Sequence, residues 1–105
     1  MIITRGFVDQ RQLDDAITKA EHLLGPDVIY VRHSLGEDWG GEPAIFFRVL
    51  LSDAASKPDR LHEVTSRIEA IIDHTVDPLN SWGLFPHFKF RSQSEQSIIQ
   101  EPAWA

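Results

Sequence analysis

The stretch GEDWGGEPAIFFRVLLSD, Gly36 to Asp53, decides the fold, because it joins a glycine-rich acidic loop to the clearest strand of the chain. Within it, Ala44 to Leu51 is a run of apolar and aromatic residues broken only by one arginine, which is typical of a buried strand. Val28 to Leu35 is rich in β-branched and aromatic residues and predicts a second strand. The two strands predict an antiparallel hairpin whose connection, Gly36 to Pro43, is longer than usual.

One amphipathic helix is expected before this hairpin in the sequence, and a second is expected after it. From Gln10 to Leu24, apolar residues recur every three or four positions, with Asp9 placed to cap the start and Gly25 to stop the helix. A second helix is expected after Ser56, which is a good capping residue, and it should end at Asp77 because a proline follows.

The last predicted strand, Leu84 to Arg91, belongs at a sheet edge, because Pro86 cannot donate to a central ladder. Ile2 to Arg5 could form an additional opening strand. We therefore expect an α+β two-layer sandwich, with two helices on one face of a mainly antiparallel sheet of three or four strands. It would be ferredoxin-like if the opening strand pairs and αββαβ if it does not. Residues 1–92 should form one domain, and residues 93–105 a polar C-terminal tail or docking segment, with Asn80 to Gly83 as a turn before the last strand.

Composition and charge restrict the class of function. The 105 residues suit one domain, and 42% hydrophobic residues suit a globular one. A formal net charge of −6 disfavours general affinity for duplex DNA or anionic membranes, which bind by neutralising phosphates. The absence of cysteine excludes disulfides and thiolate metal sites. No apolar run reaches membrane length and no signal peptide is recognisable, so we expect a soluble cytoplasmic protein.

Alternation along the predicted strands gives the sheet two faces of different character. The helix-covered face should be apolar apart from His33, and it consists of Ile29, Val31, Leu35, Ile45, Phe47, Val49, Leu51, Phe88 and Phe90. The opposite face, called the open face below, consists of Tyr30, Arg32, Ser34, Phe46, Arg48, Leu50, His87, Lys89 and Arg91. All of these except Ser34 are candidate interaction residues.

The open face admits three interpretations. Aromatic side chains mixed with arginine are typical of protein interfaces, and an apolar patch of this kind is expected to be covered. Aromatic and cationic side chains also form stacking platforms for single-stranded RNA, or could bind a small ligand, although no RNP-type motif is present. A plain solvated sheet is the third interpretation. We favour an interface with a partner protein or with a second copy of the chain.

The acidic loop is a second candidate site. Glu37, Asp38 and Glu42 lie close together among glycines and could hold Mg²⁺ or Ca²⁺, which would support a metal-dependent hydrolase. Their spacing does not match a known calcium loop. His33 and His87 could join such a site only by converging, and the predicted register places them on opposite faces of the sheet.

We favour a structural role for this loop. Trp39 is expected to fold back as a lid on the core, and the acidic residues are expected to pair with basic residues such as Arg48 or to stay solvated. No phosphate-loop or nucleophile motif is present. We therefore expect no metal site and no cofactor, and the sequence favours a function that is not enzymatic.

Ser92, Gln93, Ser94 and Glu95 follow the last strand and offer many hydrogen-bonding groups. Such residues could belong to a functional strand end, but an ordinary polar exit from the strand is the simpler interpretation. Trp104 is a candidate for docking into a groove or onto a neighbouring chain.

Two stretches, GEDWGGEPAIFFRVLLSD and FRSQSEQ (residues 90–96), resemble small bacterial proteins of unassigned function. The resemblance implies no catalytic residue. By analogy with antitoxins, which are small, acidic and made beside a partner, it suggests a non-enzymatic interaction module that binds the product of a neighbouring gene or its own second copy.

Overall fold

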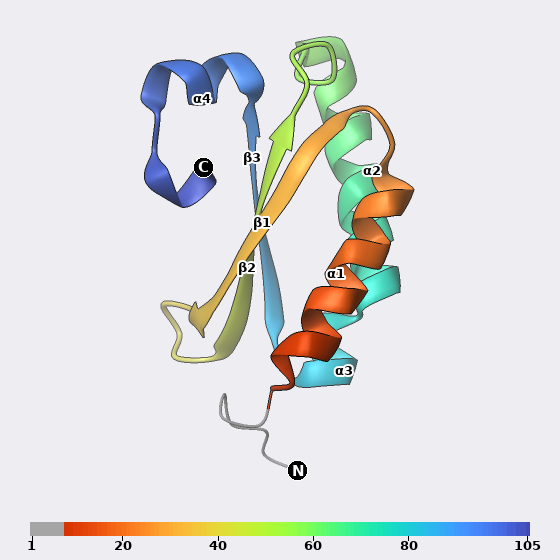
Figure 1. The fold of residues 1–105 in the computed structure, drawn as a ribbon, viewed down its shortest axis with the longest axis vertical. Coiled ribbons are helices and arrows are strands. Elements are labelled where there is room, and N and C mark those ends of the chain that lie inside the picture. The colour runs from red at the N-terminus through yellow and green to blue at the C-terminus, as the bar shows by residue number, and fades with distance from the viewer. Residues whose placement is uncertain (1–7) are drawn as a thin grey trace.

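A computed structural model describes residues 8–105, so the predicted strand from Ile2 to Arg5 lies outside the described residues. The elements, drawn in Figure 1, are α1 (Gln10–Leu24), β1 (Val28–Glu37), β2 (Pro43–Leu51), α2 (Pro58–Val76), α3 (Pro78–Trp82), β3 (Phe85–Ser92), α4 (Gln93–Ile99) and the 3-10 helix η2 (Pro102–Trp104). The fold is of the α+β class, as predicted.

The sheet is mixed rather than mainly antiparallel. Its strand order is β1-β2-β3, with β1 antiparallel to β2 and β2 parallel to β3. The parallel pairing arises because α2 carries the chain back along the sheet before β3 begins, and such crossovers join parallel neighbours. Since β2 has a strand on each side, any further strand would have to join the outer edge of β1 or β3.

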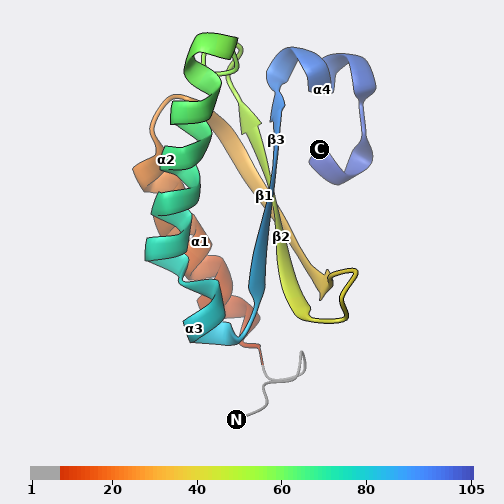
Figure 2. The ribbon, with the colours of Figure 1, turned by 180° about the vertical axis from the view of Figure 1, so that it is seen from behind.

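The two long helices cover one face of this sheet. Figures 1 and 2 show α1 and α2 together on one side, with α4 and the C-terminal residues on the other side. Asp9 caps α1 as predicted, because its carboxylate accepts hydrogen bonds from the backbone N–H groups of Arg11 and Gln12.

The core lies between the helices and the sheet, and the predicted register of β2 is confirmed. Phe47 and Val49 are buried beneath the helices. Phe88 stacks on Phe47 with ring centroids 5.2 Å apart, but Phe88 and Phe90 are only partly buried because β3 is an edge strand.

Ile29 was predicted to face the core, and this prediction is wrong. Val28 pairs with Leu51 and Tyr30 pairs with Leu50, which are consecutive residues of β2. Ile29 is therefore an extra residue of β1 that has no partner in β2. Such a β-bulge reverses the alternation of side chains at that point. Ile29 is consequently exposed, and Val28 packs against the core in its place.

Two predicted local features also differ from the structure. Lys57, not Ser56, occupies the N-cap position of α2, and the Ser56 hydroxyl instead donates to the backbone oxygen of Ser52. The segment expected to be a turn before β3 is the short helix α3, which starts with Pro78 in its first turn. Residues 93–105, expected to be a polar tail or docking segment, form α4 and η2 and return across the sheet.

Candidate functional site

The pairing of the three strands arranges the open face in rows that run across the sheet. These rows are Tyr30–Leu50–Arg91, Arg32–Arg48–Lys89 and Ser34–Phe46–His87. All eight candidate interaction residues therefore lie on one continuous surface, as the alternation predicted. This surface is the candidate functional site, and the chain's own C-terminal residues cover part of it.

The first row is covered by Trp104. The Tyr30 hydroxyl donates to the backbone oxygen of Trp104, and the Arg91 guanidinium lies 4.4 Å from the centre of the Trp104 ring. Trp104 and Leu50 are only 3% and 4% exposed, yet neither belongs to the core beneath the helices. A second, smaller apolar contact therefore exists on the open face, centred on one indole ring.

The second row binds the backbone of the same segment. The Arg48 Nε donates to the backbone oxygen of Ala103 at 2.8 Å, and the Arg32 Nε donates to that of Ala105 at 3.0 Å. Arg48 also donates to the Ser34 hydroxyl at 3.0 Å. Both guanidinium groups therefore bind main-chain oxygens of the C-terminal segment.

Arg91 connects the sheet to the bend of the C-terminal segment. Its two terminal nitrogens donate to the Gln96 side chain at 2.8 Å and to the Glu101 carboxylate at 2.9 Å. The Gln96 amide donates in turn to the backbone oxygen of Glu101 at 3.0 Å. One arginine thus contacts the indole of Trp104, a carboxylate and an amide.

The third row lies beside the acidic loop. Phe46 and His87 stack with ring centroids 5.2 Å apart. The His87 Nε2 lies 3.5 Å from a carboxylate oxygen of Asp38, which is an ion-pair distance without hydrogen-bond geometry. This buried nitrogen therefore has no hydrogen-bond partner within the described chain, and Asp38 is the acid nearest to it.

A pocket of about 390 Å³ remains open on this face. It is lined by Ser34, Phe46, Phe47, Arg48, His87, Phe88, Lys89, Glu101, Ala103 and Trp104. Its walls combine aromatic rings, two cationic side chains and a carboxylate from the C-terminal segment. It is the part of the open face that the segment borders but does not fill.

Trp39 does not fold back on the core, so the predicted lid is wrong. Its side chain is fully exposed. The Asp38 carboxylate accepts hydrogen bonds from the backbone N–H groups of Gly40 and Glu42, and this closes a tight turn that directs Trp39 outward. The same backbone donors, with Glu42 foremost, hold the pKa of Asp38 below its usual value.

Of the three acids of the loop, Asp38 contacts His87 rather than Arg48, which was named as an example of a basic partner. The two histidines lie on opposite faces, as predicted, since His33 contacts Asp14 of α1 at 3.4 Å. Burial lowers the pKa of His33, although the negative charge of Asp14 opposes that change. Within residues 8–105, no three His, Cys, Asp or Glu side chains are grouped closely enough to hold a metal ion.

The strand-end candidates form a helix cap. The Ser92 hydroxyl accepts from the backbone N–H of Glu95 at 3.1 Å, and the Glu95 carboxylate accepts from that of Ser92 at 2.9 Å. The sequence pattern S-x-x-E is the signature of this capping box and could have predicted α4. Gln93 is exposed in the first turn, while Ser94 hydrogen-bonds the carboxylate of Asp53 through both its N–H and its hydroxyl.

Asp53 was not among the predicted site residues, although it ends the first of the two quoted stretches. Its contact with Ser94 ties the end of β2 to the start of α4 and lowers the pKa of Asp53. The Ser92 N–H similarly lowers the pKa of Glu95. These polar groups fix the direction in which the C-terminal segment leaves the sheet, which is a structural role.

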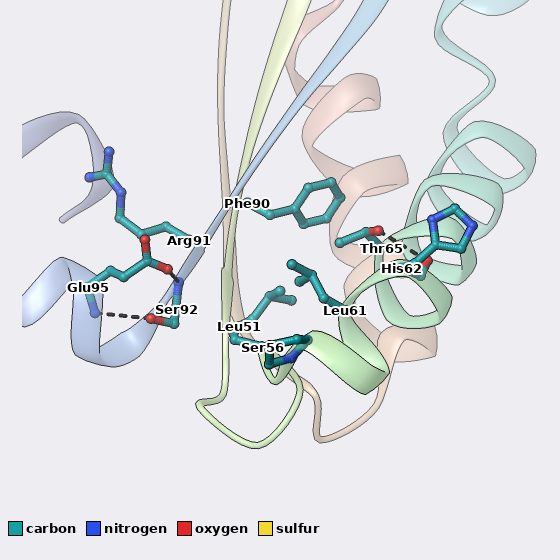
Figure 3. A pocket seen from close by; sticks show the side chains of 10 residues that line it. Leu51, Ser56, Leu61, His62, Thr65, Phe90, Arg91, Ser92 and Glu95 are labelled. Carbon is teal, nitrogen blue, oxygen red and sulfur yellow. Dashed lines mark hydrogen bonds between the residues drawn. The ribbon is translucent and has the colours of Figure 1, made fainter.

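A second cleft, of about 620 Å³, lies near the end of β3 (Figure 3). Leu51, Leu61 and Phe90 form its apolar floor, and Figure 3 shows Leu61 and Phe90 pointing toward each other across it. The polar groups at its rim, such as Thr65 and Ser92, are used in hydrogen bonds within the chain. His62 also lines the cleft, but the polar groups of Ser56, Thr65, Arg91, Ser92 and Glu95 are all used within the chain, which makes the cleft a poor small-molecule site.

Comparison with protein-family models, with curated proteins and with solved structures finds no match to this chain.

Proposed function

We propose that the protein is a non-enzymatic interaction module that binds a partner protein through its open face. The observation that carries this proposal is Trp104, a tryptophan of a short polypeptide segment buried on that face by Tyr30, Leu50 and Arg91. A deeply buried aromatic anchor beside an arginine is the usual centre of a protein interface. The surface is therefore suited to bind polypeptide.

The pocket beside the segment supports the same proposal. It leaves Phe46 half-buried next to Arg48 and His87, where a side chain of a partner could insert. By contrast, Ser92, Glu95 and Asp38 already satisfy backbone N–H groups, which leaves them without an evident role in catalysis. Pairing with a neighbouring gene product, in the manner of an antitoxin, is the biological setting we propose.

Single-stranded RNA is the second candidate partner. The row Arg32–Arg48–Lys89 places three cations side by side, and the Phe46–His87 stack lies in the next row. Cations along a backbone path with stacked rings beside them are typical of single-stranded nucleic-acid sites. The acidic net charge of −6 and the coverage of Arg32 and Arg48 by the C-terminal segment favour a protein partner instead.

Two further points belong to this proposal. A ferredoxin-like fold would require an opening strand that joins the sheet. A cytoplasmic location would suit an antitoxin-like protein. No helix within residues 8–105 has the length and apolar character needed to cross a membrane.

The test is Phe46→Glu, with Leu23→Glu as the matched control. Phe46 lines the open-face pocket, whereas Leu23 is an exposed apolar residue of α1. We expect Phe46→Glu to split a dimer or to release a co-purifying protein, with little effect of salt, because a buried apolar contact is lost. Leu23→Glu should change neither. If Phe46→Glu keeps its oligomeric state and every partner, the proposal is wrong.

Salt dependence separates the two partners. If RNA binds, affinity should fall steeply with salt, and Arg48→Ala should reduce the slope by roughly one phosphate contact. A protein partner held mainly by apolar contact should depend on salt only weakly.

A further inference from the structure

We propose that the open face selects an acidic, tryptophan-bearing segment of a partner protein, and that the chain's own segment Glu101–Ala105 occupies this site until the partner displaces it. This inference rests on the proposed function and names the chemistry of the partner. The C-terminal segment shows, contact by contact, what the site recognises.

Three side chains of the sheet bind the main chain of the segment, and Gln96 of α4 binds the backbone oxygen of Glu101. Tyr30, Arg32 and Arg48 donate to the backbone oxygens of Trp104, Ala105 and Ala103 respectively. Every polypeptide has these carbonyl groups, so the donors can hold any segment that follows the same path. Main-chain contacts of this kind provide affinity, and pockets for particular side chains provide specificity.

Specificity comes from Arg91. Its guanidinium stacks on the Trp104 indole and also forms an ion pair with Glu101, three residues earlier in the chain. One side chain therefore detects an aromatic ring and a carboxylate at a fixed spacing. A segment lacking either group would lose one of the two contacts.

The charge of the site favours a partner more acidic than the chain's own segment. Arg48 binds the uncharged backbone oxygen of Ala103, and Lys89 is exposed at the edge of the pocket. Glu101 is the acidic side chain of the native segment, and it is already paired with Arg91. Additional carboxylates on a partner segment would meet this cationic row and gain an attraction that the native segment lacks.

The native segment is built to be displaced. The helix α4 that leads to it has no buried residue, and Ile98 and Ile99 are exposed. The turn into the segment occurs at Gln100, whose positive φ of 54° is unfavourable for a residue other than glycine. Release of Glu101–Ala105 would therefore leave the helix-covered core intact and relieve this turn.

The experiment uses the full chain with Trp104→Ala, which removes the native anchor without shortening the protein. Binding of fluorescently labelled peptides is measured by anisotropy, with wild-type protein as the control. The peptides are Glu-Glu-Pro-Ala-Trp-Ala, a neutral form with both glutamates replaced by glutamine, and a form with alanine in place of tryptophan.

We expect the acidic tryptophan peptide to bind the Trp104→Ala protein at least about tenfold more tightly than the wild type, because intramolecular competition is removed. The alanine peptide should bind about 30-fold more weakly, as loss of an interface anchor predicts. The neutral peptide should also bind more weakly, and the difference should shrink at high salt. Arg91→Ala in the same background should abolish the discrimination among the three peptides.

If Trp104→Ala does not fold, hydrogen exchange of wild-type residues 101–105 provides the readout, since excess acidic tryptophan peptide should increase exchange there. Equal affinity for the tryptophan and alanine peptides, or no release of the native segment, would overturn the inference. So would displacement of the segment only by a single-stranded oligonucleotide, or only by a second copy of the chain. If none of the peptides binds while Phe46→Glu still releases a partner, the inference is wrong and the proposed function stands.

Discussion

Docking of the C-terminal segment should contribute only a small part of the stability of the protein. Burial of one indole ring is worth about 5 kcal/mol. Each hydrogen bond from Tyr30, Arg32 and Arg48 adds about 1 kcal/mol net. Ordering the backbone of Glu101–Ala105 costs about 1–2 kcal/mol per residue, so these opposing contributions nearly cancel. We therefore expect docking to be favourable by at most about 3 kcal/mol.

This ceiling predicts the effect of Trp104→Ala on unfolding. Once the segment has undocked, the mutation has nothing further to destabilise, so the free energy of unfolding should fall by no more than about 3 kcal/mol. A buried aromatic residue in a core usually costs about 3–5 kcal/mol when replaced by alanine. Trp104 should cost less because it lies outside the core beneath the helices.

The assay combines urea unfolding followed by circular dichroism with amide hydrogen exchange. In the Trp104→Ala protein, protection should be lost across residues 101–105 and kept in β2 and α2. A loss of more than about 4 kcal/mol, or loss of protection in β2, would contradict the argument, because it would make the segment part of the main core.

Three other perturbations test the structure. Phe47→Ala should reduce the free energy of unfolding by about 3–5 kcal/mol in urea, and near-normal stability would contradict the register of β2. Ser92→Ala should cost about 1 kcal/mol and reduce the helical signal of α4, since it removes one half of the capping box. His33 has a folded-state pKa below its ordinary value of 6.5. As the pH falls, His33 is therefore protonated in the unfolded chain before it is protonated in the folded protein. Its contribution to stability is complete above pH 6.5 and is lost as the pH falls through the folded-state pKa. His33→Gln should therefore make the melting temperature depend less on pH in this range. An unchanged dependence on pH would argue against the burial of His33.

Local sequence patterns were sufficient for most of the elements. The bounds of α1 were predicted correctly because a cap at Asp9, a helical repeat of apolar residues and Gly25 all agree. The alternation in β2 predicted which residues face the helices and which lie on the open face. The pattern S-x-x-E at Ser92 also encoded α4, although it had been interpreted as a polar strand exit.

Tertiary structure decided the features that depend on residues far apart in the chain. Whether β3 pairs parallel to β2 depends on the path of α2 across the sheet, and no local pattern within β3 records that path. The bulge at Ile29 likewise depends on how β1 and β2 pair. Above all, the sequence predicted an open face that something should cover, but only the fold brings Trp104 to Tyr30, across 74 positions of the chain. Local sequence patterns determine the residues of the open face and those of the C-terminal segment separately. They do not determine that the two come into contact, because that contact depends on the whole fold.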